Sequence, residues 1–229
     1  ADVVFDLTSS DTTEGTVTPS SVTFSSLTWS TPQVLTLTGV DDFAIDGDIA
    51  YSITVHVNAT SDAAYAPLLD RTVSVLNTDN ESPGITVSPT SGLSTSESGL
   101  SSTFAVVLNS MPIATVTIGI ASDNPAEGES DVSLVTFTPS NWSVPAFVSV
   151  SGVDDAVADG ARVFHVVTAP AFSADPDYSM RNASDVTVTN LDNDVVGVVA
   201  TPSMLSVVEG GASGSIEVSL TSQPTASVT

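Results

Sequence analysis

Apolar residues alternate with serine, threonine and other small residues over short stretches along most of the chain. This period of two is typical of strands that bury one face, and the spacing typical of helices is nearly absent. The pattern predicts seven strands in the best-defined stretch, over residues 84–88, 103–109, 115–120, 132–138, 146–152, 162–168 and 185–190. Seven short strands in about 110 residues indicate an immunoglobulin-like antiparallel β-sandwich, so we expect an all-β fold.

The pattern recurs with an offset of 113 residues, which carries Gly39 onto Gly152 and Trp29 onto Trp142. The same offset relates the longer motifs Gly39-Val40-Asp41-Asp42 and Gly152-Val153-Asp154-Asp155, the acids Glu14 and Glu127, and the closing motifs Asn77-x-Asp79-Asn80 and Asn190-x-Asp192-Asn193. A further match starts at Gly197, the counterpart of Gly84, with one residue lost on the way. Such periodicity predicts a linear array of tandem domains. We assign residues 1–82 to the C-terminal part of a first repeat, 83–195 to a complete second repeat and 196–229 to the N-terminal part of a third.

Positions that stay apolar in two copies are predicted to face the core. Phe104, Val106 and Leu108 match Ile216, Val218 and Leu220, whereas the residues between them become Glu217 and Ser219 in the third copy. The same comparison adds Val148, Val150, Phe164, Val166, Val186 and Val188 in the second copy, with Leu35, Leu37, Tyr51, Ile53, Val73 and Val75 as their counterparts in the first.

The first and third copies are partial sandwiches in this assignment. Residues 1–82 lack the first two strands of the repeat, and residues 196–229 supply those two strands and the start of the next. A partial sandwich leaves sheet edges and a core face open to water. Either the sequence belongs to a much longer chain, or the tail of one copy completes the head of the next. Arrays need continued or capped ends, which favours the first explanation, and both predict head-to-tail contact between neighbouring copies.

The charge balance excludes some classes of partner. Three Lys and Arg residues face 27 Asp and Glu residues, and the formal net charge of −24 repels phosphate backbones and anionic membranes. We therefore expect no nucleic-acid binding. The chain has no cysteine, which excludes a disulfide framework and a thiol nucleophile. No apolar run approaches the roughly 20 residues of a membrane span, so we expect no direct membrane insertion by these residues.

The acids are predicted to gather at one end of each sandwich, because alternate loops of an antiparallel sandwich lie at the same end. In the second repeat these loops carry Glu97, Glu127 and the acidic segments 154–159 and 192–194. Gathered carboxylates destabilise a fold unless a cation neutralises them. Calcium, which takes about six to eight oxygens in flexible geometry, suits such a cluster better than magnesium. We predict Ca²⁺ here; the alternative is that these residues only form turns and solubilise the surface.

These residues resemble the Calx-beta domain family along the whole chain. The resemblance rests on Val207-Val208-Glu209-Gly210-Gly211, on the Asp-Asp-x-x-x-Asp-Gly turn and on the closing Asn-x-Asp-Asn motif. That family is a calcium-binding β-sandwich, often found in tandem in cell-surface and adhesive proteins. The resemblance implies ligand roles for Glu97, Asp154, Asp155, Asp159, Asp192 and Asp194 in the second repeat, and for Asp41, Asp42, Asp46 and Asp79 in the first. Our predicted metal ligands also include the repeat-related acids Glu14, Glu127 and Glu209.

The sequence departs from the family pattern at several of these positions. Asp46 and Asp159 stand where the family usually has Glu, and Ala161 replaces an acid that Asp48 still supplies in the first repeat. Asn80 and Asn193 interrupt the terminal run of acids. Each departure is expected to weaken calcium affinity or to reduce the number of ions.

The predicted function is a structural module of a secreted or cell-surface filament, stalk or adhesin. The last strand of a repeat leaves at the acidic end, so calcium there would stiffen the junction with the next repeat. One alternative is an adhesive array that binds glycans or partner proteins. Another is a calcium-sensing regulatory domain of a membrane protein, which fold analogy alone favours.

Other candidate chemistry is weaker. Asn58, Asn141 and Asn182 lie in sequons predicted at the end opposite the acids, where glycans would not obstruct metal. His165 and His56 do not recur between copies, so we predict surface histidines and no enzyme activity. The recurring tryptophans, Trp29 and Trp142, are predicted to pack a corner of the sandwich, with a sugar-stacking platform as the alternative.

Overall fold

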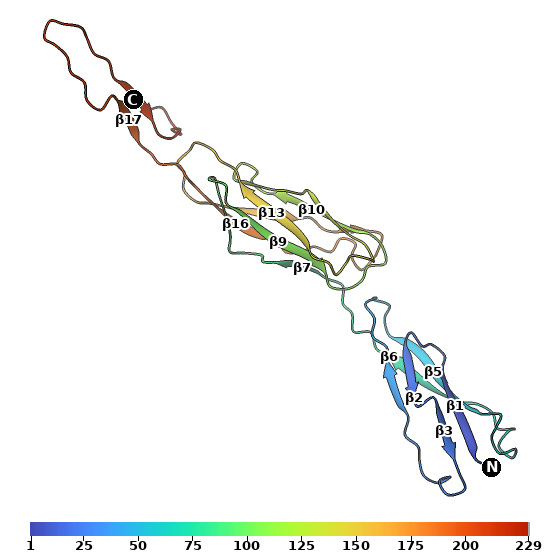
Figure 1. The fold of residues 1–229 in the computed structure, drawn as a ribbon. Coiled ribbons are helices and arrows are strands. Elements are labelled where there is room, and N and C mark those ends of the chain that lie inside the picture. Colours follow the sequence, from blue (N-terminus) through green and yellow to red (C-terminus); the bar gives the residue numbers. More distant parts are fainter. Residues whose placement is uncertain (229) are drawn as a thin grey trace. The chain divides into compact units, whose positions relative to one another are not determined.

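The computed structural model describes residues 1–228, and every regular element among them is a β-strand (Figure 1). The all-β prediction is therefore confirmed. The chain forms two compact units, one over Ala1–Ser82 and one that begins at Pro83. Each unit is described by itself below.

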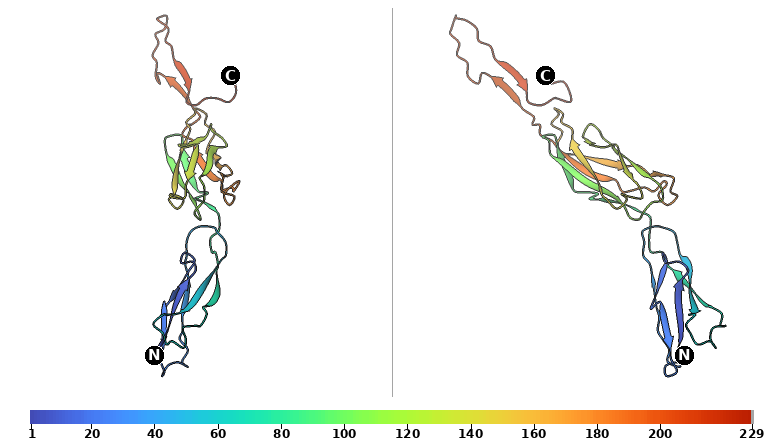
Figure 2. Two further views of the ribbon diagram at one scale, coloured as in Figure 1. Left: turned by 90° about the vertical axis from the view of Figure 1, so that its right-hand side faces the viewer. Right: turned by 45° about the vertical axis from the view of Figure 1, so that its right-hand side comes forward.

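The second unit contains a sandwich with two layers (Figure 2). Its strands are β7 (Ile85–Ser88), β8 (Leu93–Ser96), β9 (Ser101–Leu108), β10 (Val116–Ser122), β11 (Gly128–Ser130), β12 (Leu134–Phe137), β13 (Ala146–Gly152), β14 (Arg162–Thr168), β15 (Phe172–Ser173) and β16 (Val186–Leu191). One layer has the order β12-β10-β14-β16-β8, with β15 beside β10, and the other has the order β11-β13-β9-β7. Each of the seven strands expected in this repeat is present, with ends that differ by about two residues at most.

Strand β8 was not predicted. It pairs in parallel with β16, so the chain leaves the layer of β7, crosses to the other layer and returns to pair β9 with β7. Its two buried residues are the polar Thr95 and Ser96, and the Thr95 hydroxyl donates to Asn190 Oδ1 at 3.0 Å. Because only Leu93 in this strand is a large apolar residue, the alternating pattern is too weak to reveal it.

The core of this sandwich lies between the two layers. All nine positions predicted for it are buried: Phe104, Val106, Leu108, Val148, Val150, Phe164, Val166, Val186 and Val188. Full burial of a Val, Leu or Phe side chain contributes about 1.5–3 kcal/mol, so this contiguous cluster dominates the stability of the sandwich. Trp142 packs against the same cluster, as predicted for a corner residue.

The first unit has strands β1 (Val3–Ser9), β2 (Gly15–Thr18), β3 (Ser21–Phe24), β4 (Thr36–Gly39), β5 (Ile49–Val57) and β6 (Arg71–Asn77). They form one sheet of order β3-β1-β5-β6 and a second sheet of β2 and β4 alone. Within residues 1–82, no strand takes the places that β7, β8 and β9 have in the second unit. The buried core is consequently small and centres on Leu7, Tyr51 and Ile53.

Two predicted core positions of the first unit are wrong for this reason. Val73 on β6 is 51% exposed and Leu37 on β4 is also exposed, although their counterparts Val186 and Val150 are fully buried. Leu35 and Val75 are partly buried. Burial at these positions requires strands that residues 1–82 do not contain.

Strands β17 (Val198–Thr201) and β18 (Glu217–Leu220) form a two-stranded antiparallel ribbon that joins no other sheet in the described chain. The predicted core positions Ile216, Val218 and Leu220 are exposed here. That expectation was wrong because no second layer faces the ribbon. We call residues Gly197–Ser222, which include both strands, the tail hairpin.

Candidate metal centre

Three carboxylates converge at one end of the second unit. Glu97, Asp192 and Asp194 each offer an oxygen that lies within 4.8 Å of the other two. Glu97 stands in the turn after β8, and the two aspartates follow β16. The parallel pairing of β8 with β16 makes this meeting possible, because it brings the ends of both strands to the same place.

Backbone hydrogen bonds fix the position of Glu97. Its amide donates to the carbonyl of Leu191 at 3.1 Å, which extends the pairing of β8 with β16. The turn that follows is tight because Gly99 adopts a positive φ of 102°, which glycine tolerates without steric cost. The amide of Asn193 then donates to Glu97 Oε2 at 3.2 Å. The Glu97 carboxylate is thus held at the exit of β16.

Asp192 ties the exit of β16 to the loop between β13 and β14. Its Oδ1 accepts from the amide of Asp194 at 2.7 Å, and its Oδ2 accepts from the amide of Gly160 at 2.6 Å. These two donors lower the pKa of Asp192 below its usual range, so it is ionised at neutral pH. The loop acids are held in the same place: Asn193 donates to Asp154 Oδ1 at 2.9 Å.

The other two members of the group, Glu97 and Asp194, have raised pKa values. Burial raises the pKa of Glu97, and the charges of Asp192, Asp155 and Asp154 add to the shift. Burial also raises the pKa of Asp194, with the same three neighbours adding to it. Asp194 Oδ2 is buried without a hydrogen-bond partner among the described residues. A buried acceptor normally has a partner, and a bound cation would supply one here.

The first unit has its own acidic group, at the corresponding end. One oxygen from each of Glu14, Asp42 and Asp46 lies within 4.8 Å of the others. Together with Asp41 and Asp79 they line a cleft of about 160 Å³. The remaining lining residues are Gly39, Val40, Gly47, Asn77, Thr78, Asn80 and Glu81.

The repeated Asp-Asp-x-x-x-Asp-Gly motif folds in the same way in both units. In the first, Gly47 has a φ of 77° and its amide donates to Asp79 Oδ2 at 2.8 Å. In the second, Gly160 has the same φ and donates to Asp192 in the corresponding bond. In both units the motif therefore forms a loop in which the amide of the last glycine donates a hydrogen bond to the aspartate after the final strand, Asp79 or Asp192.

The two groups nevertheless use different members of the repeat. Asp159, the counterpart of Asp46, accepts from Arg162 Nε at 2.9 Å, and the residue at the position of Arg162 in the first unit is Ile49. In the second unit Arg162 therefore neutralises Asp159. In the first unit the corresponding acid, Asp46, has no such arginine and belongs to the acidic group. Conversely, Glu97 has no counterpart within residues 1–82.

Comparison with known proteins gives a likeness in fold alone. No protein family and no curated protein matches the sequence. The apo-form Calx CBD1 domain is a similar solved structure, with 15% identity and a TM-score of 0.38 over 48% of this chain and 96% of that one. Domains 4 and 5 of the S-layer protein SbsC give 16% and 0.34 over 82% and 70%. Domains 1–6 of SbsC give 15% and 0.37, and there the chain spans 28% of the matched structure.

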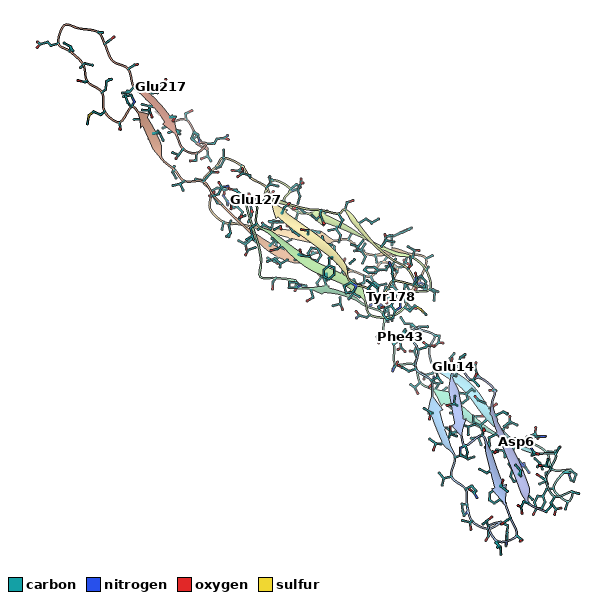
Figure 3. All side chains as sticks on the ribbon, viewed as in Figure 1. Asp6, Glu14, Phe43, Glu127, Tyr178 and Glu217 are labelled. Atoms are coloured by element: carbon teal, nitrogen blue, oxygen red, sulfur yellow. The ribbon has the colours of Figure 1, made fainter. Side chains whose placement is uncertain are left out.

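The remaining predicted ligands lie outside the two groups. Asp155 Oδ1 accepts from the amide of Val157 at 2.6 Å, within the same loop. Glu127 contacts this loop through its backbone carbonyl, which accepts from the amide of Val153, and Figure 3 shows it at the opposite end of the sandwich from Tyr178. Glu209 is exposed on the tail hairpin and belongs to neither group.

Sequence reasoning missed Glu81. Burial raises the pKa of Glu81, and a hydrogen bond with Asp79 and the charges of Asp41 and Asp79 add to the shift. The amide of Glu81 donates to Asp79 Oδ1 at 2.9 Å, as that of Asp194 does to Asp192. The signal was present in the sequence, because the 113-residue offset carries Glu81 onto Asp194.

The other candidate residues are at the surface. Asn141 and Asn182 are exposed, and Asn58 donates from Nδ2 to Asp6 Oδ2 at 2.6 Å. His165 and His56 are exposed as predicted, each with Nδ1 beside an aspartate, Asp123 and Asp70 respectively. Residues 1–228 form no helix long and apolar enough to cross a membrane.

Proposed function

We propose that this protein is a non-enzymatic, calcium-binding structural module of an extracellular or cell-surface filament, stalk or adhesin. The observation that carries the proposal is the group of Glu97, Asp192 and Asp194, in which Asp194 Oδ2 is buried without a partner. A divalent cation bound by these oxygens would satisfy that atom and relieve the repulsion among the three carboxylates.

The donor set favours calcium over other metals. All three groups are carboxylates, further acids stand nearby in Asp154 and Asp155, and neither histidine belongs to the group. Oxygen-only sets of this kind suit hard cations, and ligands drawn from separate loops suit the flexible coordination of calcium. Calcium sites of extracellular modules have affinities of about 10⁻⁴ to 10⁻³ M, which matches their environment.

The location of the group suggests how calcium would act. Asp192 and Asp194 directly follow β16, and only Val195, Val196 and Gly197 separate them from β17. An ion that holds both aspartates to Glu97 orders the segment from which the next domain starts. Successive domains of an array would thereby be stiffened, which is the property that a filament or stalk requires.

The glycan-binding alternative finds one supporting feature, the 72% exposed Trp29. Its counterpart Trp142 packs against the core of the second unit. We therefore attribute the exposure of Trp29 to the missing strands of the first unit. An exposed tryptophan at this position is not a feature of every repeat. For this reason we favour the structural role.

Calorimetric titration with calcium, and thermal melting with calcium and with a chelator, test the proposal. Wild type is expected to bind calcium and to melt several degrees higher with it, by about 4 °C for each kcal/mol of stabilisation. Glu97→Gln removes one charged ligand and is expected to lose most of that increment. Glu129→Gln is the matched control, because Glu129 is exposed on β11 and belongs to neither group. Equal melting temperatures with and without calcium in wild type would refute the proposal.

A further inference from the structure

One asparagine position recurs next to the acidic group of each unit. Asn77 is the last residue of β6, and the 113-residue offset carries it onto Asn190 in β16. Asn190 is 1% exposed, so its side-chain amide has to find hydrogen-bond partners within the protein. Each asparagine stands two residues before the first acid that follows, Asp79 or Asp192. The partners of the two amides therefore show which segments are fixed around the acids.

In the first unit, the side-chain amide of Asn77 joins three segments. Its Nδ2 donates to Glu14 Oε2 at 3.1 Å and to the carbonyl of Val40 at 3.1 Å. Glu14 is only 9% exposed, and Val40 directly precedes Asp41 and Asp42. One amide thus holds a carboxylate of the acidic group and the start of the loop that carries a second member, Asp42.

In the second unit, Asn190 joins segments that carry the acids of that unit. Its Nδ2 donates to the carbonyl of Val153 at 3.4 Å, and its Oδ1 accepts from the hydroxyl of Thr95 at 3.0 Å. Val153 directly precedes the acidic loop 154–159, and Thr95 lies two residues before Glu97. The bond to the loop carbonyl is the one found at the corresponding position of the first unit, and the bond to Thr95 fixes the strand that leads to Glu97.

The glycine that opens the acidic motif leaves room for this asparagine. A Cβ atom at Gly39 would collide with Asn77 Oδ1, and a Cβ atom at Gly152 would collide with Asn190 Oδ1. Neither glycine has a positive φ, so the backbone itself would accept another residue at both positions. The space that the asparagines occupy therefore explains why glycine recurs at these positions.

We propose that Asn77 and Asn190 are positioning residues for the two acidic groups, and that Gly39 and Gly152 provide the space that receives them. The inference rests on the calcium binding proposed above. An amide suits this role because it donates a hydrogen bond without neutralising the acid, which keeps its charge for the cation. Groups that hydrogen-bond around metal ligands orient those ligands, and losing one typically lowers metal affinity by about 10- to 100-fold. The asparagines act through the acids and are not themselves ligands.

Calcium titration of the full 229-residue chain in a Glu97→Gln background tests the first unit, because that background removes a ligand from the second unit alone. Asn77→Ala is expected to lower the calcium affinity of the first unit by about tenfold. Gly39→Ala should lower it by a similar factor, because the new methyl group displaces the Asn77 amide. Beyond the chain neighbours of Gly39, Asn77 is the only described residue with atoms within 4 Å of that methyl position. The two changes combined should lose no more than either alone, because both remove the same hydrogen bonds.

Asn58→Ala is the matched control. Asn58 donates from Nδ2 to Asp6 Oδ2 at 2.6 Å, so this change removes the same kind of bond from the same unit, but Asp6 belongs to neither acidic group. The variant should lose stability in urea denaturation without calcium, as Asn77→Ala does, and should keep the calcium affinity of its parent. The comparison separates a positioning residue from a residue that only stabilises the fold.

Thr95→Val tests the second unit in a Glu14→Gln background, which removes a ligand from the first unit alone. The change keeps the shape of the side chain and removes the hydroxyl that donates to Asn190. The calcium affinity of the second unit is expected to fall by about fivefold, less than in the first unit because the bond to the loop remains. Ser102→Ala is the control, because the Ser102 hydroxyl holds the same strand through the carbonyl of Ser94 at 2.6 Å. That variant should keep the affinity.

The outcomes separate this proposal from the proposed function. Unchanged affinity in Asn77→Ala or Thr95→Val would overturn the positioning role, as would an equal loss in either control variant. Unchanged affinity in Gly39→Ala would overturn the role assigned to the glycine. Calcium binding by wild type that the Glu97→Gln background abolishes would leave the proposed function standing and overturn the assignment of Asn77. A chain that binds no calcium in any of these forms would overturn both proposals.

Discussion

The two units show what the same repeat does with and without its first strands. Strands β10 to β16 of the second unit and β1 to β6 of the first are counterparts in sequence, yet Val186 is fully buried and Val73 is 51% exposed. The difference is the hairpin of β7 and β9 together with β8. The core of this fold thus forms only when strands distant in sequence cover one another. Alternation along one strand specifies which of its faces is apolar, but not whether another layer covers that face.

The acidic groups of the two units also differ in composition because the two units contain different strands. In the first unit the group is drawn from the loop before β2 and the loop after β4, whereas in the second it requires Glu97, which follows β8. Arg162 neutralises Asp159 in the second unit, and Ile49 leaves Asp46 unpaired by any arginine in the first. The composition of a metal site here follows from the strands present and from single neighbouring residues, even though the loop motif is the same.

The largest expected effect comes from truncating one repeat position in both contexts. Phe104→Ala empties a fully buried site and is expected to cost about 3–5 kcal/mol of unfolding free energy. Ile216→Ala, at the same position of the repeat but exposed, is expected to cost less than about 1 kcal/mol when measured on monomeric chain. Urea denaturation followed by tryptophan fluorescence checks both values.

The fluorescence of each unit can be isolated because Trp29 lies in the first unit and Trp142 in the second. The Trp29→Phe background reports on the second unit, in which both substitutions lie. Comparable losses for Phe104→Ala and Ile216→Ala in monomeric chain would mean that the hairpin is already buried, and the comparison between the units would collapse.

Much of the fold could be predicted because it depends on local signals. Alternation located seven strands of the second unit, and comparison between copies chose the inward face, as the burial of Phe164 and Val166 confirms. These signals work because a strand with one buried face has to repeat every two residues. The prediction was wrong at Val73, Leu37 and Ile216, where the inward face exists but its covering layer does not.

The candidate site was harder to foresee. Spacing placed the acids at one end, but which three would meet depends on β8, a polar strand without a periodic signal. The ion pair between Arg162 and Asp159 joins a loop acid to the start of β14, and the acidic motif contains no signal that predicts this pair. Glu81 could have been predicted from the 113-residue offset, which places it at the position of Asp194. Whether the grouped acids bind calcium stays a prediction.

Exchanging the residue that distinguishes the two acidic ends should move their calcium affinities in opposite directions. Arg162→Ile frees Asp159 and removes a positive charge, so the affinity of the second unit is expected to rise by about two- to fivefold, roughly 0.5–1 kcal/mol. Ile49→Arg introduces the cation beside Asp46 and should lower the affinity of the first unit by a similar factor. Calorimetric titration of each variant measures the change.

Arg181→Ile is the control for the first of these variants, because it removes a positive charge from the second unit at a residue that belongs to neither acidic group. A rise in affinity equal to that of Arg162→Ile would assign the effect to net charge alone. The distinction between the two ends would then not depend on the local pair with Asp159.

The smallest effect expected is a pH dependence whose sign calcium reverses. The raised pKa values of Glu97 and Asp194 mean that, without ion, the folded chain takes up protons at a higher pH than the unfolded chain. Acidification from neutral pH through these raised pKa values therefore stabilises the ion-free fold at this site. With calcium bound the carboxylates must stay ionised, and the same acidification weakens binding and lowers the melting temperature.

The first unit contains no counterpart of Glu97, so Glu97→Gln isolates the contribution of the second. Without calcium at pH 7 the variant is expected to melt about 1–3 °C above wild type, because it removes an unfavourable charge, and the gap should close on acidification. With saturating calcium the order should invert at pH 7, and that difference should also shrink toward acid pH. Melting curves of wild type and variant that remain parallel across the pH range, with calcium and without, would show that Glu97 does not sense the neighbouring carboxylates.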